Sequence, residues 1–295
     1  MLLPKFNYHA PTSIDEACSL LGHYGAKAKV LAGGTDLLVN LKKKLLAPEQ
    51  IISLNKIDGL TGVSDQKGKG IFIGPLSTAA YLVGSRLIQE KGTVLGQGAG
   101  RLGSPLIRNR ATVGGNLVTA RPASDLAPPL LVLGASLILK SPKGERPVPL
   151  EDFILGPGQT AIQPDEILSQ IFIPYFEGPS SGAYIKLGSR KALEISLVNV
   201  ASFLALGPDG SIEQARVALG AVGPTPLLSP SAAKVLKGVK PKDEKDPVFK
   251  EAAGAAAKDA RPITDHRGSA EYRREMVEVL ALRTLKAAYV QAIRQ

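Results

Sequence analysis

The sequence contains very few of the residues that build covalent or metal sites. Its 295 residues include one cysteine, Cys18, and three widely separated histidines, His9, His23 and His266. A single cysteine cannot close an internal disulfide, and it cannot supply the several thiolates of a zinc site or an iron–sulfur cluster. We therefore expect no metal site in this chain, and we interpret Cys18 as a buried thiol within a helix.

Aromatic residues are also scarce, although the chain is basic. Tryptophan is absent, aromatic residues make up 5% of the chain, and the formal net charge is +10. A basic protein can bind nucleic acid, but single strands are usually held by aromatic side chains interleaved with basic ones. Because that pattern is missing, we expect no nucleic-acid partner. A non-catalytic nucleotide- or nucleic-acid-binding module stays an alternative.

Long apolar runs are missing as well. No run approaches the roughly 18–20 apolar residues that span a membrane, and residues 1–6 do not have the layout of a signal peptide. We therefore expect a cytoplasmic protein without a membrane span. With 44% apolar and 21% charged residues, the chain has a globular composition and enough length for two or three domains.

Two separate segments each place a pair of glycines beside a threonine. They are residues 30–39, VLAGGTDLLV, and residues 107–117, IRNRATVGGNL. Because glycine has no Cβ, a ligand can lie against the main chain and several N–H groups can point at it. One such pair is commonly just a tight turn. Two pairs with matching chemistry predict a ligand that carries two phosphates.

Basic residues are concentrated around the second of these segments. Between Lys91 and Ser124 there are five cations and no acidic residue, which predicts a positive field around a phosphate-bearing ligand or an acidic partner. An uneven surface charge is the simpler alternative. Residues 98–103 also match G-x-G-x-x-G, but Ser104 and Pro105 follow where a Rossmann helix would begin. We therefore expect only a glycine-rich loop at the edge of the ligand.

Hydrophobic patterns and turn residues divide the chain into three units. Residues 1–55 form a small α/β unit, in which residues 28–32 are predicted to be a buried strand. Residues 56–177 form a second α/β unit, which ends at a linker-like stretch, 177–182. Residues 178–295 form an α+β unit. Its three predicted antiparallel strands are 183–187, 196–206 and 216–222, and its predicted helices are 231–236, 249–260 and 269–294.

The glycine segments resemble those of the FAD-binding medium subunit of molybdenum hydroxylases, the superfamily of xanthine dehydrogenase, CO dehydrogenase and aldehyde oxidoreductase. The resemblance continues, in the same order, through residues 121–128 (RPASDLAP), 184–187 (YIKL) and 269–274 (SAEYRR). It implies an α+β, vanillyl-alcohol oxidase-like (PCMH-type) fold, with FAD extended between the first two units. A C-terminal domain with a three-stranded antiparallel sheet and helices would follow.

The resemblance also implies which residues bind FAD. The two glycine segments would hold its pyrophosphate, Asp125 would accept a hydrogen bond from a ribose hydroxyl, and Lys186 would lie at the flavin edge. Leu102, Leu168 and Ile195 would contact or flank the isoalloxazine ring. The full expected set is Leu31, Ala32, Gly33, Gly34, Thr35, Asp36, Leu37, Leu102, Thr112, Gly114, Gly115, Asn116, Thr119, Asp125, Leu168, Lys186 and Ile195.

Four of these assignments have simpler alternatives. Asp125 can be a helix cap and Lys186 a surface lysine, while Leu168 and Ile195 can be ordinary strand residues. No side chain is expected to act as a catalytic acid or base.

The function implied by the resemblance is electron transfer. A molybdopterin-binding large subunit would oxidise the substrate, and a small subunit with [2Fe–2S] clusters would pass electrons to FAD in this chain. NAD+ or another acceptor would then receive them, within a heterotrimer that can dimerise. A free-standing FAD-dependent oxidase or reductase of the same fold is the alternative, and it would need catalytic tyrosine, histidine or arginine side chains over the ring.

Overall fold

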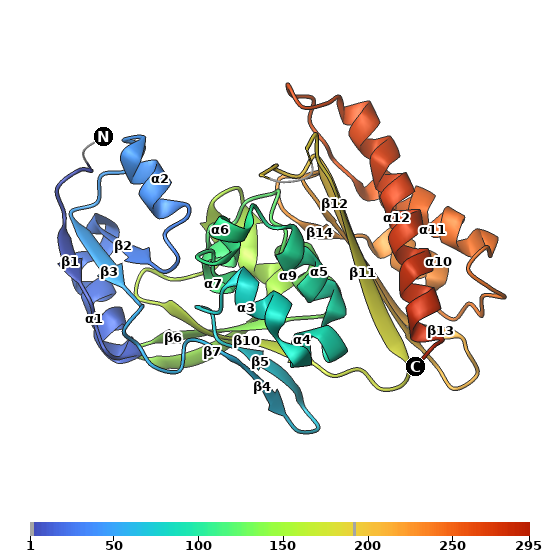
Figure 1. Cartoon of the computed structure of the whole chain (residues 1–295), viewed down its shortest axis with the longest axis horizontal. Helices are drawn as coiled ribbons and strands as arrows, with labels where there is room; N and C mark the ends of the chain where they lie inside the picture. Colours follow the sequence, from blue (N-terminus) through green and yellow to red (C-terminus); the bar gives the residue numbers. More distant parts are fainter. Residues whose placement is uncertain (1–2, 191–192) are drawn as a thin grey trace.

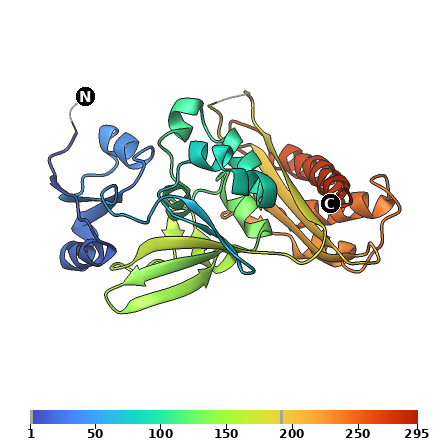
Figure 2. The ribbon, with the colours of Figure 1, turned by 60° about the horizontal axis from the view of Figure 1, so that its bottom comes forward.

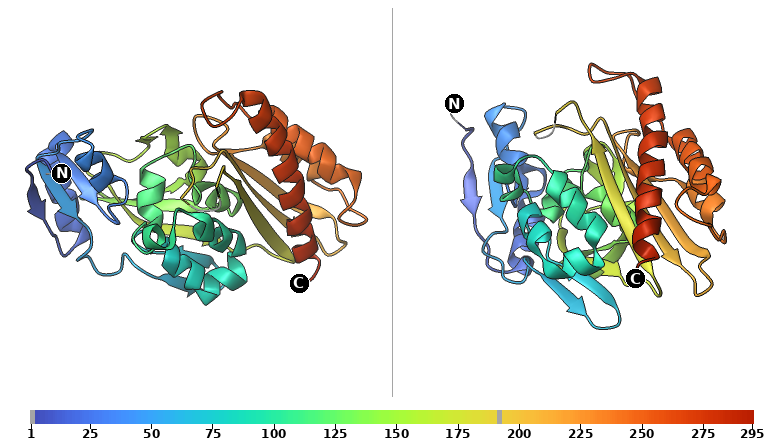
Figure 3. Two further views of the ribbon diagram at one scale, coloured as in Figure 1. Left: turned by 45° about the horizontal axis from the view of Figure 1, so that its top comes forward. Right: turned by 45° about the vertical axis from the view of Figure 1, so that its right-hand side comes forward.

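The computed structural model describes residues 3–190 and 193–295 and shows three units arranged in a row (Figure 1). Each unit is built around its own sheet, of three, five and four strands in chain order. Two further orientations show the N-terminal unit at one end, the C-terminal unit at the other and a helical layer between them (Figure 3).

The N-terminal unit is a parallel sheet with the strand order β1-β3-β2. Helix α1 begins at a capping box. Ser13 Oγ accepts from the N–H of Glu16, and Glu16 Oε2 accepts from the N–H of Thr12. The prediction of a strand at 28–32 is confirmed as β2, but its predicted burial is wrong, since Lys29 and Val30 are exposed. The elements are β1 (Asn7–His9), α1 (Ile14–Tyr24), η1 (Gly25–Lys27), β2 (Ala28–Leu31), α2 (Leu37–Lys42) and β3 (Gln50–Ser53).

The second unit is an antiparallel sheet with the order β4-β5-β10-β6-β7, with helices on one of its faces (Figure 2). Its strands are β4 (Val63–Gln66), β5 (Gly70–Ile73), β6 (Ser136–Ser141), β7 (Gly144–Pro149), β8 (Ile154–Gly156), β9 (Gln159–Thr160) and β10 (Ile167–Pro174). Its helices are α3 (Ala79–Gly84), α4 (Arg86–Lys91), α5 (Thr93–Arg101), α6 (Pro105–Arg108), α7 (Val113–Val118), α8 (Ala127–Val132) and α9 (Leu150–Phe153).

Most of the glycine-rich segment 98–103 forms the end of helix α5, which runs to Arg101. The prediction of a loop at these residues is therefore wrong. A Cβ on Gly98 would collide with the carbonyl oxygen of Asp125 and lie 2.7 Å from Cγ of Pro129. This glycine therefore allows α5 to pack closely against the segment that leads into α8.

The third unit is an antiparallel sheet of four strands rather than the expected three, because the two-residue strand β14 pairs with β13. Helices α10 to α12 pack on one face, and α5 and α8 contact it from the second unit. Strand β12 is buried at all nine positions, as expected for a strand covered on both faces. The elements are β11 (Ser180–Leu187), β12 (Val198–Leu206), β13 (Ile212–Gly220), β14 (Leu227–Leu228), α10 (Pro230–Leu236), α11 (Pro247–Asp259) and α12 (Ala270–Ala292).

Candidate functional site

A cavity of about 310 Å³ lies where the N-terminal unit meets the second unit, within the range of about 300–1,000 Å³ typical of cofactor sites. Both glycine segments contribute to its wall, although some eighty residues separate them. The expected site residues that line it are Ala32, Gly33, Gly34, Thr35, Asp36, Leu37, Leu102, Thr112, Gly114, Gly115, Asn116, Thr119 and Leu168.

The loop between β2 and α2 offers main-chain donors to this cavity. Within residues 3–190 and 193–295, the N–H groups of Gly33, Gly34 and Thr35 donate to no protein acceptor. Successive free N–H groups form a concave site for an anion. The first glycine segment therefore has the donors that a phosphate-bearing ligand requires.

The two glycines of this loop are needed for different reasons. A Cβ on Gly33 would collide with the carbonyl oxygen of Arg110, in the first part of the second segment. Gly34 has φ +78, where a Cβ would also lie 3.0 Å from Cδ1 of Leu38, and most side chains avoid that backbone region. The absent Cβ of Gly33 therefore brings the two segments together, in addition to leaving room for a ligand.

The N–H groups of the second glycine pair and its two neighbours, Val113 to Asn116, are not free, contrary to the expectation from the sequence. Val113 N–H donates to Ser77 O and Gly114 N–H to Pro75 O, while the N–H groups of Gly115 and Asn116 donate to the side chain and the carbonyl of Thr112, respectively. Its glycines allow close packing instead, since a Cβ on Gly114 would lie 2.6 Å from Cβ of Pro75.

Side chains of the second segment remain available to the cavity. Asn116 Oδ1 accepts a hydrogen bond from Ser124 Oγ at 2.5 Å, which directs the amide nitrogen to other acceptors. Thr112 Oγ1 accepts from the N–H of Gly115 and keeps its own hydrogen to donate. The second segment can therefore hold an anion through side-chain donors, while the first does so through its backbone.

The remaining wall is largely apolar, and except for Val30, Ile107 and Ala111 it comes from outside the two glycine segments. The residues outside the segments could not be predicted from sequence patterns, because they share no motif and are brought together only by tertiary packing. The additional lining residues are Val30, Leu54, Pro75, Leu76, Ile107, Ala111, Val118, Ile162, Glu166 and Ile167.

Among the described residues that line this wall, Glu166 is the one carboxylate that was not predicted from the sequence. The guanidinium of Arg146 donates to both of its oxygens, at 2.6 and 2.8 Å, and the N–H of Gln163 donates to Oε2 at 2.7 Å. The hydrogen bond from Arg146 is the main reason that the pKa of Glu166 is lowered from its ordinary value of 4.5. Glu166 therefore stays ionised and neutralised by a fixed partner.

We expect Glu166→Gln to lower the free energy of unfolding by about 1.5–3 kcal/mol, the usual range for hydrogen bonds to a charged group. Because the folded pKa lies below the unfolded one, the carboxylate stabilises the chain above the ordinary value of 4.5. That stabilisation is lost as pH falls through the lower folded pKa. Melting temperatures of both proteins across this pH range should converge in acid; a constant difference would contradict the assignment.

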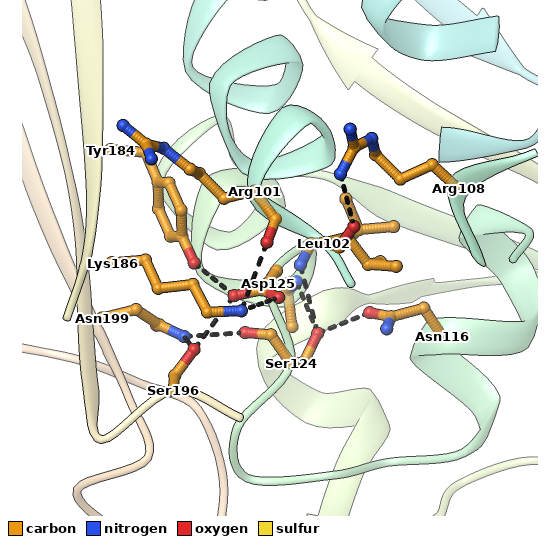
Figure 4. Close-up of polar contacts among 12 residues, drawn as sticks. Arg101, Leu102, Arg108, Asn116, Ser124, Asp125, Tyr184, Lys186, Ser196 and Asn199 are labelled. Atoms are coloured by element: carbon orange, nitrogen blue, oxygen red, sulfur yellow. Dashed lines mark hydrogen bonds and ion pairs between the residues drawn. The ribbon is translucent and has the colours of Figure 1, made fainter. Parts of the chain in front are cut away.

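A second polar group, which we call the Asp125 cluster, consists of Asp125, Tyr184, Lys186 and Ser196 (Figure 4). Asp125 Oδ1 accepts from Tyr184 Oη at 2.7 Å and from Ser196 Oγ at 3.0 Å, and Lys186 Nζ lies 2.7 Å from Oδ2. The side chains of Lys186 and Asp125 are only 10% and 8% exposed. Burial, followed by the charge of Asp125, raises the pKa of Tyr184 well above its ordinary value, so the phenol remains a donor.

The Asp125 cluster lies beside the cavity and is joined to it at two points. Lys186 Nζ donates to the carbonyl of Arg101 at 3.3 Å, next to the lining residue Leu102. Ser124, the neighbour of Asp125, donates to the lining residue Asn116 (Figure 4). The cluster can therefore position two parts of the cavity wall without forming that wall.

Four of the expected FAD-binding residues are thus not among those that line the cavity: Leu31, Asp125, Lys186 and Ile195. Leu31 packs against Gly34. The carboxylate of Asp125 accepts from three protein donors, and its hydrogen bond with a ribose hydroxyl stays a prediction. Lys186 is a buried ion-pair partner rather than a surface lysine, and Ile195 is 53% exposed.

Comparison with known families matches the chain over nearly its full length. A family model described as the FAD binding domain in molybdopterin dehydrogenase matches residues 4–176. A second, described as the CO dehydrogenase flavoprotein C-terminal domain, matches residues 183–288. The first match covers more than half of the chain and contains every residue that lines the cavity.

Individual relatives agree with these families. The carbon monoxide dehydrogenase medium chain of Hydrogenophaga pseudoflava is 32% identical over 291 residues, covering 99% of both chains. The nicotine 6-hydroxylase medium subunit of Paenarthrobacter nicotinovorans is 34% identical over 290 residues, covering 98% of this chain and 99% of that one.

Solved structures give the same result. A carbon monoxide dehydrogenase from Hydrogenophaga pseudoflava that lacks the Mo-pyranopterin moiety of its molybdenum cofactor contains a similar chain. That chain has a TM-score of 0.93 and 32% identity, and the alignment covers 99% of this chain and 100% of that one. The protein therefore belongs to the family of FAD-binding medium subunits of molybdenum hydroxylases, and it is an oxidoreductase flavoprotein subunit whose cofactor is FAD.

Proposed function

We propose that this chain is the electron-transfer subunit of a heteromeric molybdenum hydroxylase. It would receive electrons from the [2Fe–2S] clusters of a small partner subunit, after a molybdopterin-binding large subunit has oxidised the substrate. NAD+ or another acceptor would take the electrons onward. The observation that carries this proposal is the cavity formed jointly by the two glycine segments, inside the matched FAD-binding domain.

The residues of the cavity suit a ligand that has an anionic bridge and a flat apolar part. The free N–H groups of Gly33, Gly34 and Thr35 would hold the pyrophosphate from one side. Asn116 and Thr112 would donate from the other side. The apolar side chains of Leu102, Ile107 and Leu168 provide surfaces against which a ring system can pack.

When bound, FAD supplies chemistry that side chains lack, because it exchanges electrons both singly and in pairs. The chain's own part is to bind and orient this group and to shield it from water. Leu102 and Leu168 are buried, at 7% and 4% exposure, so they close the apolar wall. The ammonium of Lys186, fixed by Asp125 beside this wall, adds a positive charge near the cavity.

The partners and location follow from the same proposal. The medium chains named above belong to enzymes of several subunits, and we infer a heterotrimer that can dimerise, located in the cytoplasm. In residues 3–190 and 193–295, no helix combines the length and apolar character needed to cross a bilayer. We keep the division into units 1–55, 56–177 and 178–295 as part of this proposal.

FAD binding to the purified full-length chain tests the first half of the proposal. We expect titration with FAD to give saturable binding with a changed visible spectrum. Asn116→Leu should weaken this binding, because the leucine cannot donate to the cavity. An exposed neighbour of the cavity, Leu106 (80% exposed), provides the matched control variant, Leu106→Ala. Equal affinity of the Asn116 variant and the wild type would remove the second segment from the site.

The second half is tested with the chain co-purified with its partner subunits. Substrate added to the complex should bleach the flavin absorption, and NAD+ or another acceptor should restore it. The chain alone should show no such bleaching with the same substrate. Substrate-dependent bleaching of the isolated chain would instead favour a free-standing flavin oxidase or reductase.

A further inference from the structure

Arg273 is a buried arginine of helix α12 that reaches three segments of the C-terminal unit. Its side chain is 3% exposed. Nη2 donates to Asp265 Oδ1 at 2.6 Å, and Nη1 donates to the carbonyls of Leu197 at 3.3 Å and Ala221 at 3.1 Å. A buried guanidinium is costly to desolvate, and an apolar residue of similar volume is often as stable. Packing alone therefore does not explain an arginine here.

The carbonyl of Leu197 places Arg273 next to the Asp125 cluster. Leu197 directly follows Ser196, whose Oγ donates to Asp125 Oδ1 at 3.0 Å. Ser196 Oγ also accepts from Asn199 Nδ2 at 3.0 Å, and that amide donates to the carbonyl of Ser124 at 3.1 Å. Holding Leu197 thus fixes the segment before β12 from which the Ser196 side chain contacts the carboxylate.

The carbonyl of Ala221 links Arg273 to the same segment from the other side. Ala221 has φ +63, a backbone region that costs energy for a residue with a Cβ. Its N–H donates to the carbonyl of Pro122 at 2.8 Å, two residues before Ser124. Arg273 therefore secures a strained residue that in turn holds the start of the 122–125 segment.

We propose that Arg273 is a positioning residue for FAD binding: it holds Leu197 and Ala221 and so sets the 122–125 segment against the cavity. The final step is the hydrogen bond from Ser124 Oγ to Asn116 Oδ1, which orients an amide in the cavity wall. The inference rests on the proposed role of that wall in FAD binding. It gives a function to the SAEYR motif, which contributes no residue to the cavity.

The test compares FAD affinity in four variants of the full-length chain, at a temperature well below all melting transitions. Arg273→Met is expected to raise the Kd for FAD by about 3- to 30-fold, the usual range for residues that act through others. Arg273→Lys should recover part of the stability, because an ammonium can still pair with Asp265. It should not recover the affinity, because one ammonium cannot hold the carboxylate and both carbonyls at once, as Nη2 and Nη1 of the guanidinium do.

Two control variants separate positioning from stability. Arg274→Met changes the exposed neighbour on the same helix and should leave both affinity and stability unchanged. Leu285→Ala removes a fully buried side chain of α12 and should cost about 2–5 kcal/mol without changing FAD affinity. If Arg273→Met weakens FAD binding no more than Leu285→Ala does, the inference is overturned. If the wild type fails to bind FAD, the proposed function fails, and this inference with it.

Discussion

Replacing Gly33 by alanine is expected to weaken FAD binding on the order of 100-fold and to lower the free energy of unfolding by about 1–3 kcal/mol. The new methyl group would collide with the carbonyl oxygen of Arg110, and overpacking of this kind usually costs the stated energy. That carbonyl belongs to the backbone, so relief requires the two segments to move apart. A displacement of roughly 1 Å can have an effect of this size on a preorganised site.

Gly254→Ala is the matched control for this substitution. Gly254 lies inside helix α11, and a Cβ there would meet no atom within 4 Å. The change should stabilise the chain by about 0.5–1 kcal/mol and leave FAD affinity unchanged. FAD titration and chemical denaturation of both variants give the comparison. Wild-type affinity in the Gly33 variant would show that the contact between the two segments is not needed for the site.

Breaking the Asp125–Lys186 pair is expected to have the largest effect on stability. Lys186→Met leaves a buried carboxylate with only neutral donors, and Asp125→Asn leaves a buried ammonium without a counter-ion. Each should lower the free energy of unfolding by about 3–5 kcal/mol, the usual cost of removing one partner of a buried pair. Both should also weaken FAD binding, since Lys186 and the neighbour of Asp125 contact the cavity wall.

A double-mutant cycle measures how much of this loss belongs to the pair itself. The double variant, Asp125→Asn with Lys186→Met, has no buried charge left at this point, so it should lose less than the sum of the single losses. Denaturant unfolding of the four proteins supplies the coupling free energy. Simple additivity would mean that the two side chains act independently, despite the 2.7 Å between Nζ and Oδ2.

The cavity also shows which chemistry a sequence motif can and cannot specify. The sequence predicted that two glycine pairs serve one ligand, and the structure brings both pairs to one cavity. It did not predict that the N–H groups of Val113 to Asn116 are used by Ser77, Pro75 and Thr112. A glycine pair signals a close approach to the main chain, but the atom that approaches can be a ligand or another backbone.

Local pattern was sufficient for several helices and strands. The capping box at Ser13, the apolar run of β12 and the Gly-Gly-Thr motif are properties of neighbouring residues, so they can be read along the chain. The two-residue strand β14 could not be found in this way, because its pairing with β13 depends on a partner elsewhere in the chain.

What the sequence alone determined is therefore the family, the cofactor and the two segments that form the core of the site, since these reside in contiguous motifs. The tertiary structure decided the partners of Asp125, Lys186, Glu166 and Arg273. Each of these charges depends on a partner 8 to 61 residues away in the sequence. Because a buried charge is stable only with such a partner, its function is set by packing that no local pattern encodes.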